Sequence, residues 1–309
     1  MRFDSFRLVP LFVLSVAAPR AAALDVVTLP AGTGVAAIAV APDGSAWFSA
    51  QFAGALGRVT PAGYVKTFRF ASGDAEPVGL AIAADGSAWT TMPSADRLGR
   101  VGPDGAPSEV RLASAGGQPT GIAVGGDGTV WFTLTAAGRA GLRGADGTVR
   151  EVALAEGGEP SALVVAGDGA AWVVERRGNR VVRVTAEGVG GAWAIPSSNA
   201  QPDAISLAPD GTLWIALPNA SRLARVAPSG EVREFPVGVT PLGLAVAADG
   251  GVWFGAPTSK RLGRLDPGSG KVAWTALPEA PVAVAAGADG SVWVALGVGD
   301  KLARVSPRN

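Results

Sequence analysis

An Asp-Gly pair followed by a tryptophan four residues after the aspartate recurs seven times in this chain of 309 residues. The tryptophans are Trp47, Trp89, Trp131, Trp172, Trp214, Trp253 and Trp293, so successive copies are 39 to 42 residues apart. A repeat of this length accommodates four short strands with their turns, which is the unit of a β-propeller blade. The recurrence therefore predicts a ring of seven similar units.

Each repeat has the local pattern of a β-hairpin. The second copy, from Pro77 to Trp89, reads as a strand of small residues, the Asp-Gly turn, and a second strand that carries the tryptophan. Asp-Gly between apolar runs is a strong hairpin signal, and no stretch shows the long 3.6-residue period of a helix. Small residues suit the crowded axis of a propeller, and the apolar second strand suits burial between blades. We therefore predict an all-β, seven-bladed β-propeller of four-stranded antiparallel blades over residues 24–309.

The two ends of this predicted domain complement each other. Leu24 to Leu29 resembles the strands that close each repeat, whereas Lys301 to Val305 is a third strand with no fourth strand after it. We expect the N-terminal strand to supply the missing outer strand of the last blade and so to close the ring.

Residues 1–23 have a different character. Two arginines within Met1 to Arg7 precede an apolar run from Leu8 to Ala18, and three alanines follow at 21–23. This order is typical of a secretory signal peptide, and the apolar run is too short to span a bilayer. The sequence therefore predicts an exported protein, periplasmic or secreted, with no membrane span in the mature chain.

Composition excludes several kinds of chemistry. The 26 basic and 26 acidic residues cancel, and no repeat holds a basic patch with exposed aromatic residues, so we expect no nucleic-acid partner. The chain contains no cysteine and no histidine, which excludes thiolate catalysis, histidine acid/base chemistry and the usual zinc or copper sites. We expect a monomer whose partner is a small-molecule ligand.

The repeats separate scaffold from candidate site, because features that recur in every unit are scaffold. By this rule the seven tryptophans are core, and the Asp-Gly pairs are turns rather than calcium loops. An arginine also recurs at one strand position in six repeats, and we expect it to form an ion pair or hydrogen bond between blades: Arg58, Arg100, Arg183, Arg225, Arg264 and Arg304.

The positions that vary lie at the end of each blade opposite the Asp-Gly turn. They are the two residues that flank the proline of strand one and the residue three after the tryptophan. In repeats six, seven and one these positions are small or apolar. In repeats two to five they are polar or acidic: Glu76, Gln118, Thr120, Glu159, Ser161, Glu175, Gln201 and Asp203. One half of the funnel mouth is therefore expected to be polar and the other half apolar.

The repeat, with its Pro-x-Gly start, its Asp-Gly turn, its tryptophan and its Leu-Gly-Arg-Val strand, resembles that of the virginiamycin B lyase (streptogramin lyase) family. The resemblance covers about residues 24 to 309. It implies a seven-bladed propeller that linearises a cyclic depsipeptide by elimination at its ester bond, and therefore a cyclic-peptide ligand as partner. In this family two glutamates hold Mg²⁺, one histidine is the base, and a second histidine binds substrate.

Carried over residue by residue, the resemblance assigns Mg²⁺ to Glu159 and Glu175 of repeat four. The base position of repeat four is Ser161, and the position of the substrate-binding histidine in the preceding repeat is Thr120. In repeat seven the equivalents of Glu159, Ser161 and Glu175 are Ala280, Val282 and Leu296. Catalysis would then fall to Ser161 and Asp203, with Asp203 or a glutamate as base. Substrate binding would fall to Thr120, Gln118, Gln201 and Glu76.

Three functions stay open at this point. The first is an exported lyase-like propeller with an altered site, and the second is a propeller that binds a small amphipathic ligand, a peptide or a protein without turnover. The third is a lactonase-like or gluconolactonase-like hydrolase, for which a fuller set of axial acidic and amide ligands to calcium would be expected. The missing histidines place the lyase activity in question.

Overall fold

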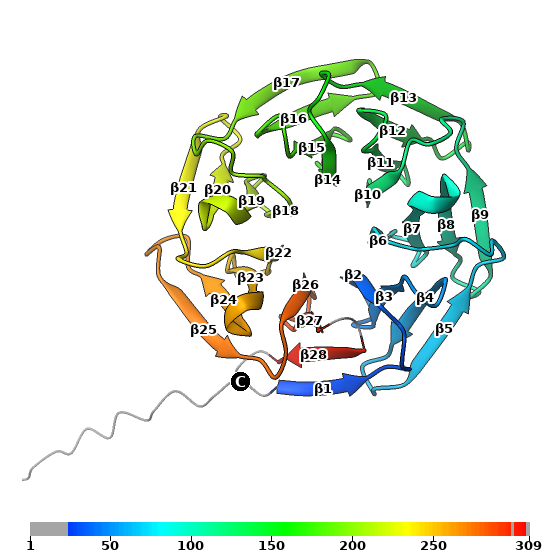
Figure 1. The fold of residues 1–309 in the computed structure, drawn as a ribbon, viewed down its shortest axis with the longest axis horizontal. Helices are drawn as coiled ribbons and strands as arrows, with labels where there is room; N and C mark the ends of the chain where they lie inside the picture. The colour runs from blue at the N-terminus through cyan, green and yellow to red at the C-terminus, as the bar shows by residue number, and fades with distance from the viewer. Residues whose placement is uncertain (1–23, 298–299, 307–309) are drawn as a thin grey trace, which may run out of the picture.

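The computed structural model describes residues 24–297 and 300–306 of the chain. Seven four-stranded antiparallel sheets stand around a central axis like the blades of a propeller (Figure 1). The predicted all-β, seven-bladed architecture is confirmed. The predicted signal peptide, residues 1–23, lies outside the described residues. No helix in the described ranges is long and apolar enough to cross a membrane.

The first four blades follow the chain in order. Blade 1 consists of β2 (Val35–Val40), β3 (Ala46–Ala50), β4 (Ala55–Val59) and β5 (Val65–Arg69). Blade 2 consists of β6 (Leu80–Ile82), β7 (Ala88–Met92), β8 (Arg97–Val101) and β9 (Pro107–Arg111). Blade 3 consists of β10 (Pro119–Val124), β11 (Val130–Leu134), β12 (Arg139–Arg143) and β13 (Val149–Ala153). Blade 4 consists of β14 (Pro160–Val165), β15 (Ala171–Glu175), β16 (Arg180–Thr185) and β17 (Gly188–Ala194).

The remaining blades repeat the plan, and the last one takes its outer strand from the N-terminal side. Blade 5 consists of β18 (Ile205–Leu207), β19 (Leu213–Leu217), β20 (Arg222–Val226) and β21 (Val232–Pro236). Blade 6 consists of β22 (Leu242–Val246), β23 (Val252–Ala256), β24 (Arg261–Leu265) and β25 (Val272–Ala276). Blade 7 consists of β26 (Pro281–Ala286), β27 (Val292–Leu296), β28 (Lys301–Val305) and β1 (Leu24–Thr28). Short 3-10 turns follow the second strand in blades 2, 5 and 6: η1 (Pro93–Ala95), η2 (Pro218–Ala220) and η3 (Pro257–Ser259).

The ring closes as the sequence predicts. β1 pairs antiparallel with β28 over five residues, from Leu24 opposite Val305 to Thr28 opposite Lys301. In Figure 1 the blue β1 lies along the outside of the red β28. Segments almost a whole chain length apart thus form one sheet.

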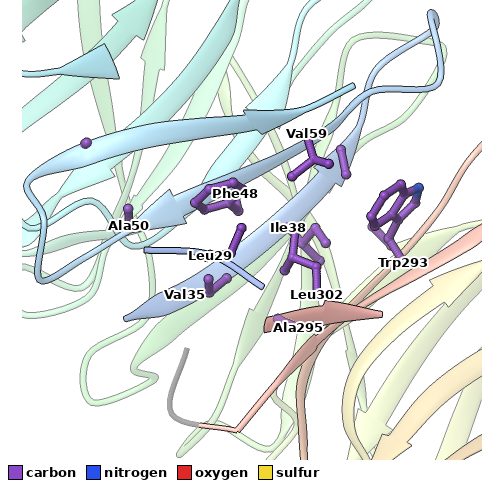
Figure 2. Close-up of a cluster of buried hydrophobic side chains, with 12 residues drawn as sticks. Leu29, Val35, Ile38, Phe48, Ala50, Val59, Trp293, Ala295 and Leu302 are labelled. Carbon is purple, nitrogen blue, oxygen red and sulfur yellow. The ribbon is translucent and has the colours of Figure 1, made fainter. Parts of the chain in front are cut away.

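The hydrophobic core lies between the blades. Each of the seven buried clusters joins side chains from two neighbouring blades, as expected for strands that are apolar on both faces. Figure 2 shows the cluster at the closing junction, where Leu29 and the blade 1 residues Val35 and Phe48 pack with Trp293 and Leu302 of blade 7. Inter-blade packing therefore holds the ring together.

Most of the repeated tryptophans are core residues, as predicted. Five are at most 6% exposed: Trp47, Trp89, Trp131, Trp214 and Trp293. Trp172 and Trp253 pack against the same kind of cluster but are only partly buried.

The recurring arginines pair within blades, which corrects the expected pairing between blades. Arg100, for example, lies 3.2 Å from Asp85, the aspartate of its own blade's Asp-Gly turn, and its guanidinium stands over the Trp89 ring. Strand three lies beside strand two, so an arginine opposite the tryptophan reaches the turn of the same hairpin. Equivalent pairs form at Arg58–Asp43, Arg183–Asp168, Arg264–Asp249 and Arg304–Asp289.

These turns make stability sensitive to acid. The backbone N–H of Ser87 holds the pKa of Asp85 below its ordinary value, and Arg100 acts in the same direction. The pKa is lowered at all seven turn aspartates: Asp43, Asp85, Asp127, Asp168, Asp210, Asp249 and Asp289. A carboxyl group with a folded pKa below the unfolded value of about 4 stabilises the fold above that pH. This contribution is lost as the pH falls through the folded pKa.

We therefore expect a melting temperature that is nearly level from about pH 7 to pH 5 and falls steeply below about pH 4. Differential scanning calorimetry across this range checks it. As a control, Asp85→Asn should lower the melting temperature at pH 7. On acidification, the melting temperature of this variant should fall by less than that of the wild type. A parallel acid response in both proteins would contradict the assignment.

Candidate functional site

The axis of the propeller holds a cavity of about 400 Å³, here called the axial cavity. Each blade contributes to its wall the residue that follows the proline at the start of the repeat, where blade 1 has Val35 in place of the proline. These residues are Ala36, Val78, Thr120, Ser161, Asp203, Leu242 and Val282. They converge because the first strands of all seven blades stand nearest the axis (Figure 1).

The wall of the axial cavity is two-sided, as the sequence predicts for the funnel mouth. Blades 3, 4 and 5 contribute Thr120, Ser161 and Asp203, whereas blades 6, 7, 1 and 2 contribute only aliphatic side chains at this position. Blade 2, which the sequence predicts for the polar half, belongs instead to the apolar side, because its wall residue is Val78 and Glu76 does not line the cavity. A ligand here would meet hydrogen-bonding groups on one side and an aliphatic surface on the other.

Threonine hydroxyls link the polar side of the cavity. Thr120 Oγ1 lies 2.6 Å from Thr135 Oγ1 and 3.0 Å from Thr133 Oγ1. Thr133 donates to the carbonyl oxygen of Ser161 and accepts from the N–H of Gly121, which joins blades 3 and 4. Ser161 itself is 8% exposed, and its hydroxyl lies 3.5 Å from the Val174 carbonyl oxygen. The polar wall is thus held in place by hydrogen bonds between blades.

One ion pair lines the same side. Asp203 of blade 5 is hydrogen-bonded to Arg176, which follows β15 in blade 4 and also lines the axial cavity. Both side chains keep some solvent access, at 24% and 41% exposed. Sequence analysis missed Arg176 because only strand positions were compared. The available signal was the Arg176-Arg177 pair, since no other turn between strands two and three within the described residues holds two adjacent arginines.

The residues before the proline lie elsewhere. Gln118, Glu159 and Gln201 have positive φ angles of 54°, 58° and 49°, and neither they nor Glu76 line the axial cavity. Gln118, Glu76 and Gln201 are exposed, and Glu76 accepts a hydrogen bond of 2.6 Å from Ser94. Gln118 and Glu159 line a separate open hollow between blades 3 and 4. Of the four predicted substrate-binding residues, only Thr120 therefore reaches the cavity.

Each glutamate predicted to hold Mg²⁺ has an arginine partner. Glu175 is 0% exposed, and its Oε2 accepts a hydrogen bond from Arg180 Nε, while Oε1 has no partner among the described residues. The partly exposed Glu159 places Oε2 2.8 Å from Arg177 Nε. Both carboxylates are thus neutralised by neighbouring guanidinium groups.

This donor set does not fit an Mg²⁺ site. Mg²⁺ requires near-octahedral oxygen ligands, and a dication at these carboxylates would be repelled by Arg177 and Arg180. Residues 24–297 and 300–306 contain no group of three or more His, Cys, Asp or Glu side chains placed to hold a metal ion. The calcium site expected for a lactonase-like protein gains no support there either.

We expect about 10 mM MgCl2 to shift the melting temperature no more than NaCl of equal ionic strength, because only a specifically bound ion stabilises the native state. Thermal shift measurements on the wild type, Glu159→Gln and Glu175→Gln check this. A stabilisation specific to Mg²⁺ in the wild type that either substitution removes would contradict the arginine-paired arrangement.

Comparisons with known proteins agree with this fold. The model of the virginiamycin B lyase family matches residues 23–305. A streptogramin B lyase structure superposes with a TM-score of 0.86 at 27% sequence identity, covering 91% of this chain and 96% of that one. Virginiamycin B lyase from Staphylococcus aureus gives a TM-score of 0.85 at 26% identity, with 93% and 99% covered.

A catalytically inactive histidine-to-alanine variant of the Staphylococcus aureus enzyme, solved with quinupristin, is 25% identical with a TM-score of 0.85, covering 93% of this chain and 99% of that one. No curated protein matches this chain by sequence. The family match spans nearly all the described residues, and the similar structures share the seven-bladed ring. This chain belongs to the virginiamycin B lyase family.

Proposed function

We propose that this protein is an exported propeller that binds a small amphipathic or peptide-like ligand in the axial cavity and does not open it. The observation that carries this proposal is the two-sided wall, with Thr120, Ser161 and Asp203 facing the aliphatic residues of the other blades. A cavity of about 400 Å³ is within the usual range for small-molecule sites. An apolar wall with a few oriented polar groups is the common arrangement of such sites.

The side chains available support the proposed loss of turnover. The chain contains no histidine, and the Staphylococcus aureus relative described as catalytically inactive carries a single histidine-to-alanine change. Serine and threonine hydroxyls are not bases near neutral pH, so Ser161 and Thr120 cannot take over proton abstraction unaided. Asp203, Glu159 and Glu175 are all engaged by arginines. Each carboxylate at the site thus already has an arginine partner, which supports the proposed loss of turnover.

Binding can still use these groups. The hydroxyls of Thr120 and Ser161 and the Arg176–Asp203 pair can exchange hydrogen bonds with amide or ester groups of a ligand. Leu242 and Val282 can contact its aliphatic or aromatic parts on the opposite side. This combination suits a cyclic-peptide-like molecule better than a uniformly polar one.

Quinupristin provides the test. Titration calorimetry should show binding, and chromatography of the same mixture should show no ring opening. Leu242→Asp, which places a charge on the apolar wall, should weaken binding at least about tenfold, since burying an unpaired charge is costly. An exposed change, Thr67→Val on β5, is the control. Ring opening would contradict the loss of turnover, and undetectable binding would contradict the ligand class.

Export is part of the proposal and rests on residues 1–23. N-terminal sequencing of the protein from the periplasmic or secreted fraction should show a start near Leu24. Retention of residues 1–23 on protein confined to the cytoplasm would contradict it.

A further inference from the structure

A second cavity lies between blades 6 and 7, near their Asp-Gly turns, and is here called the blade 6–7 groove. Its volume is about 620 Å³, and its wall includes Asp249, Trp253 and Arg264 of blade 6 with Asp289 and Val305 of blade 7. The Asp-Gly turns and the residues that line the axial cavity lie at opposite ends of the first strands. The groove is therefore separate from the proposed function site and independent of it.

Trp253 distinguishes this groove from the other blade junctions. Five of the seven repeated tryptophans are buried, and the partly buried Trp172 has Trp193 packed against it, with ring centroids 4.7 Å apart. Trp253 stays partly exposed, and the Arg264 guanidinium stands 5.8 Å from its ring centroid. The groove thus gives a ligand access to an indole.

The junction of blades 2 and 3 shows which side chain can lie over the repeated tryptophan at the equivalent position. There the guanidinium of Arg143, from blade 3, stands over Trp89 of blade 2 at 5.2 Å, in addition to Arg100 at 5.7 Å. Arg143 pairs with Val130 in its sheet, as Val305 pairs with Val292, so Arg143 and Val305 occupy the same blade position. The chain therefore places a cation over the tryptophan at one junction and a short aliphatic side chain at the other.

Two carboxylates of the groove stay open to a further cation. Asp249 and Asp289 already pair with Arg264 and Arg304 of their own blades, but their side chains remain 63% and 43% exposed. The backbone N–H of Gly251 lowers the pKa of Asp249, so this group is ionised at neutral pH. A positively charged group beside Trp253 would meet an aromatic face and two solvent-accessible carboxylates, each of which already has one arginine partner.

We propose that the blade 6–7 groove binds a ligand through a guanidinium group, which stacks on Trp253 and pairs with Asp289, as Arg143 stacks on Trp89 within the chain itself. The groove volume of about 620 Å³ leaves space for the stem that carries this group. The guanidinium can belong to a small molecule or to an arginine side chain of a peptide, and the experiment below separates these sources.

The probe is Nα-benzoyl-arginine amide, with the citrulline analogue as its neutral isostere, and titration calorimetry is the measurement. The arginine probe should bind with one site, and the citrulline probe should bind at least about tenfold more weakly, because the cation–π and ion-pair interactions need the charge. Asp289→Asn should weaken binding of the arginine probe by a similar factor. Equal binding of the two probes would overturn the proposal.

Two reciprocal variants test the comparison between Arg143 at Trp89 and Val305 at Trp253. Val305→Arg should fill the groove with the protein's own guanidinium and remove probe binding, whereas Arg143→Val should expose Trp89 and raise the stoichiometry from one site to two. Because Val305 is buried, the melting temperature of Val305→Arg is measured to show whether this variant folds. If it does not fold, Arg143→Val and Asp289→Asn test the proposal. An unchanged stoichiometry in Arg143→Val would overturn the comparison.

A capped alanine peptide with one central arginine identifies the source of the guanidinium. Tighter binding of the peptide than of the benzoyl probe assigns the groove to a polypeptide side chain, and the reverse order assigns it to a small molecule. Binding of neither overturns the proposal.

Discussion

Deletion of residues 24–31, which include β1, should lower the melting temperature by at least about 10 °C. Leu29 is 4% exposed within the cluster of Figure 2, and Leu24 and Val27 pack partly against the cores on either side of blade 7. Burial of one such side chain contributes about 1.5–3 kcal/mol, so the three together contribute about 5 kcal/mol. For a chain of this size, each kcal/mol corresponds to about 2–4 °C. The deletion also leaves β28 without its outer partner.

Differential scanning calorimetry measures this effect. Val26→Thr is the matched control, because Val26 lies on the same strand but is 45% exposed and should change stability by less than about 0.5 kcal/mol. A synthetic peptide of residues 24–31 added to the deletion variant should restore part of the loss. An unchanged melting temperature would show that blade 7 does not need β1.

Replacement of Arg180 by methionine should destabilise the protein by about 3–5 kcal/mol, because it leaves a buried carboxylate without its charge partner. Glu175 has no exposed side-chain surface, and Arg180 is the only partner of its carboxylate among the described residues. The backbone packs closely around the Glu175 carboxyl group: a Cβ built on Gly158 or Gly178 would come within 2.6 Å of it. Urea denaturation of Arg180→Met measures the loss.

Two further variants isolate the cause. Arg177→Met removes the partner of Glu159, but Arg177 is 77% exposed, so the cost should stay below about 1 kcal/mol. Glu175→Gln combined with Arg180→Met removes both charges and should recover at least half of the stability lost in Arg180→Met. Equal losses in the single and double variants would mean that Arg180 acts through packing alone.

The fold was predictable because its signals are local and repeated. The Asp-Gly pair marks a turn and the tryptophan marks the second strand, and seven copies leave little freedom in the architecture. The unpaired third strand at Lys301–Val305 also predicted how β1 closes the ring. These features depend on backbone pattern, which the sequence displays directly.

The candidate site was only partly predictable, because predicting which residues line the cavity requires the direction of their side chains. The residue after the proline position lines the axial cavity in every blade, whereas the residue before it lies outside this cavity in blades 2 to 5. The positive φ angles of Gln118, Glu159 and Gln201 are not visible in a residue pattern, since glutamine and glutamate rarely adopt them. The arginine partners of the glutamates could not be predicted for a similar reason. Arg177 and Arg180 are near Glu175 in sequence, but only the folded turn shows which carboxylate each arginine pairs with.

The way β1 and β28 meet has a mechanical consequence. Leu24 lies opposite Val305, so the polypeptide enters β1 and leaves β28 at the same end of their pairing. A force that pulled these two points apart would open the backbone hydrogen bonds one after another, beginning at Leu24 and Val305, and would not load all five residue pairs at once. Under tension applied there, the ring should therefore open at low force by unzipping this seam, while the junctions between the other blades stay intact.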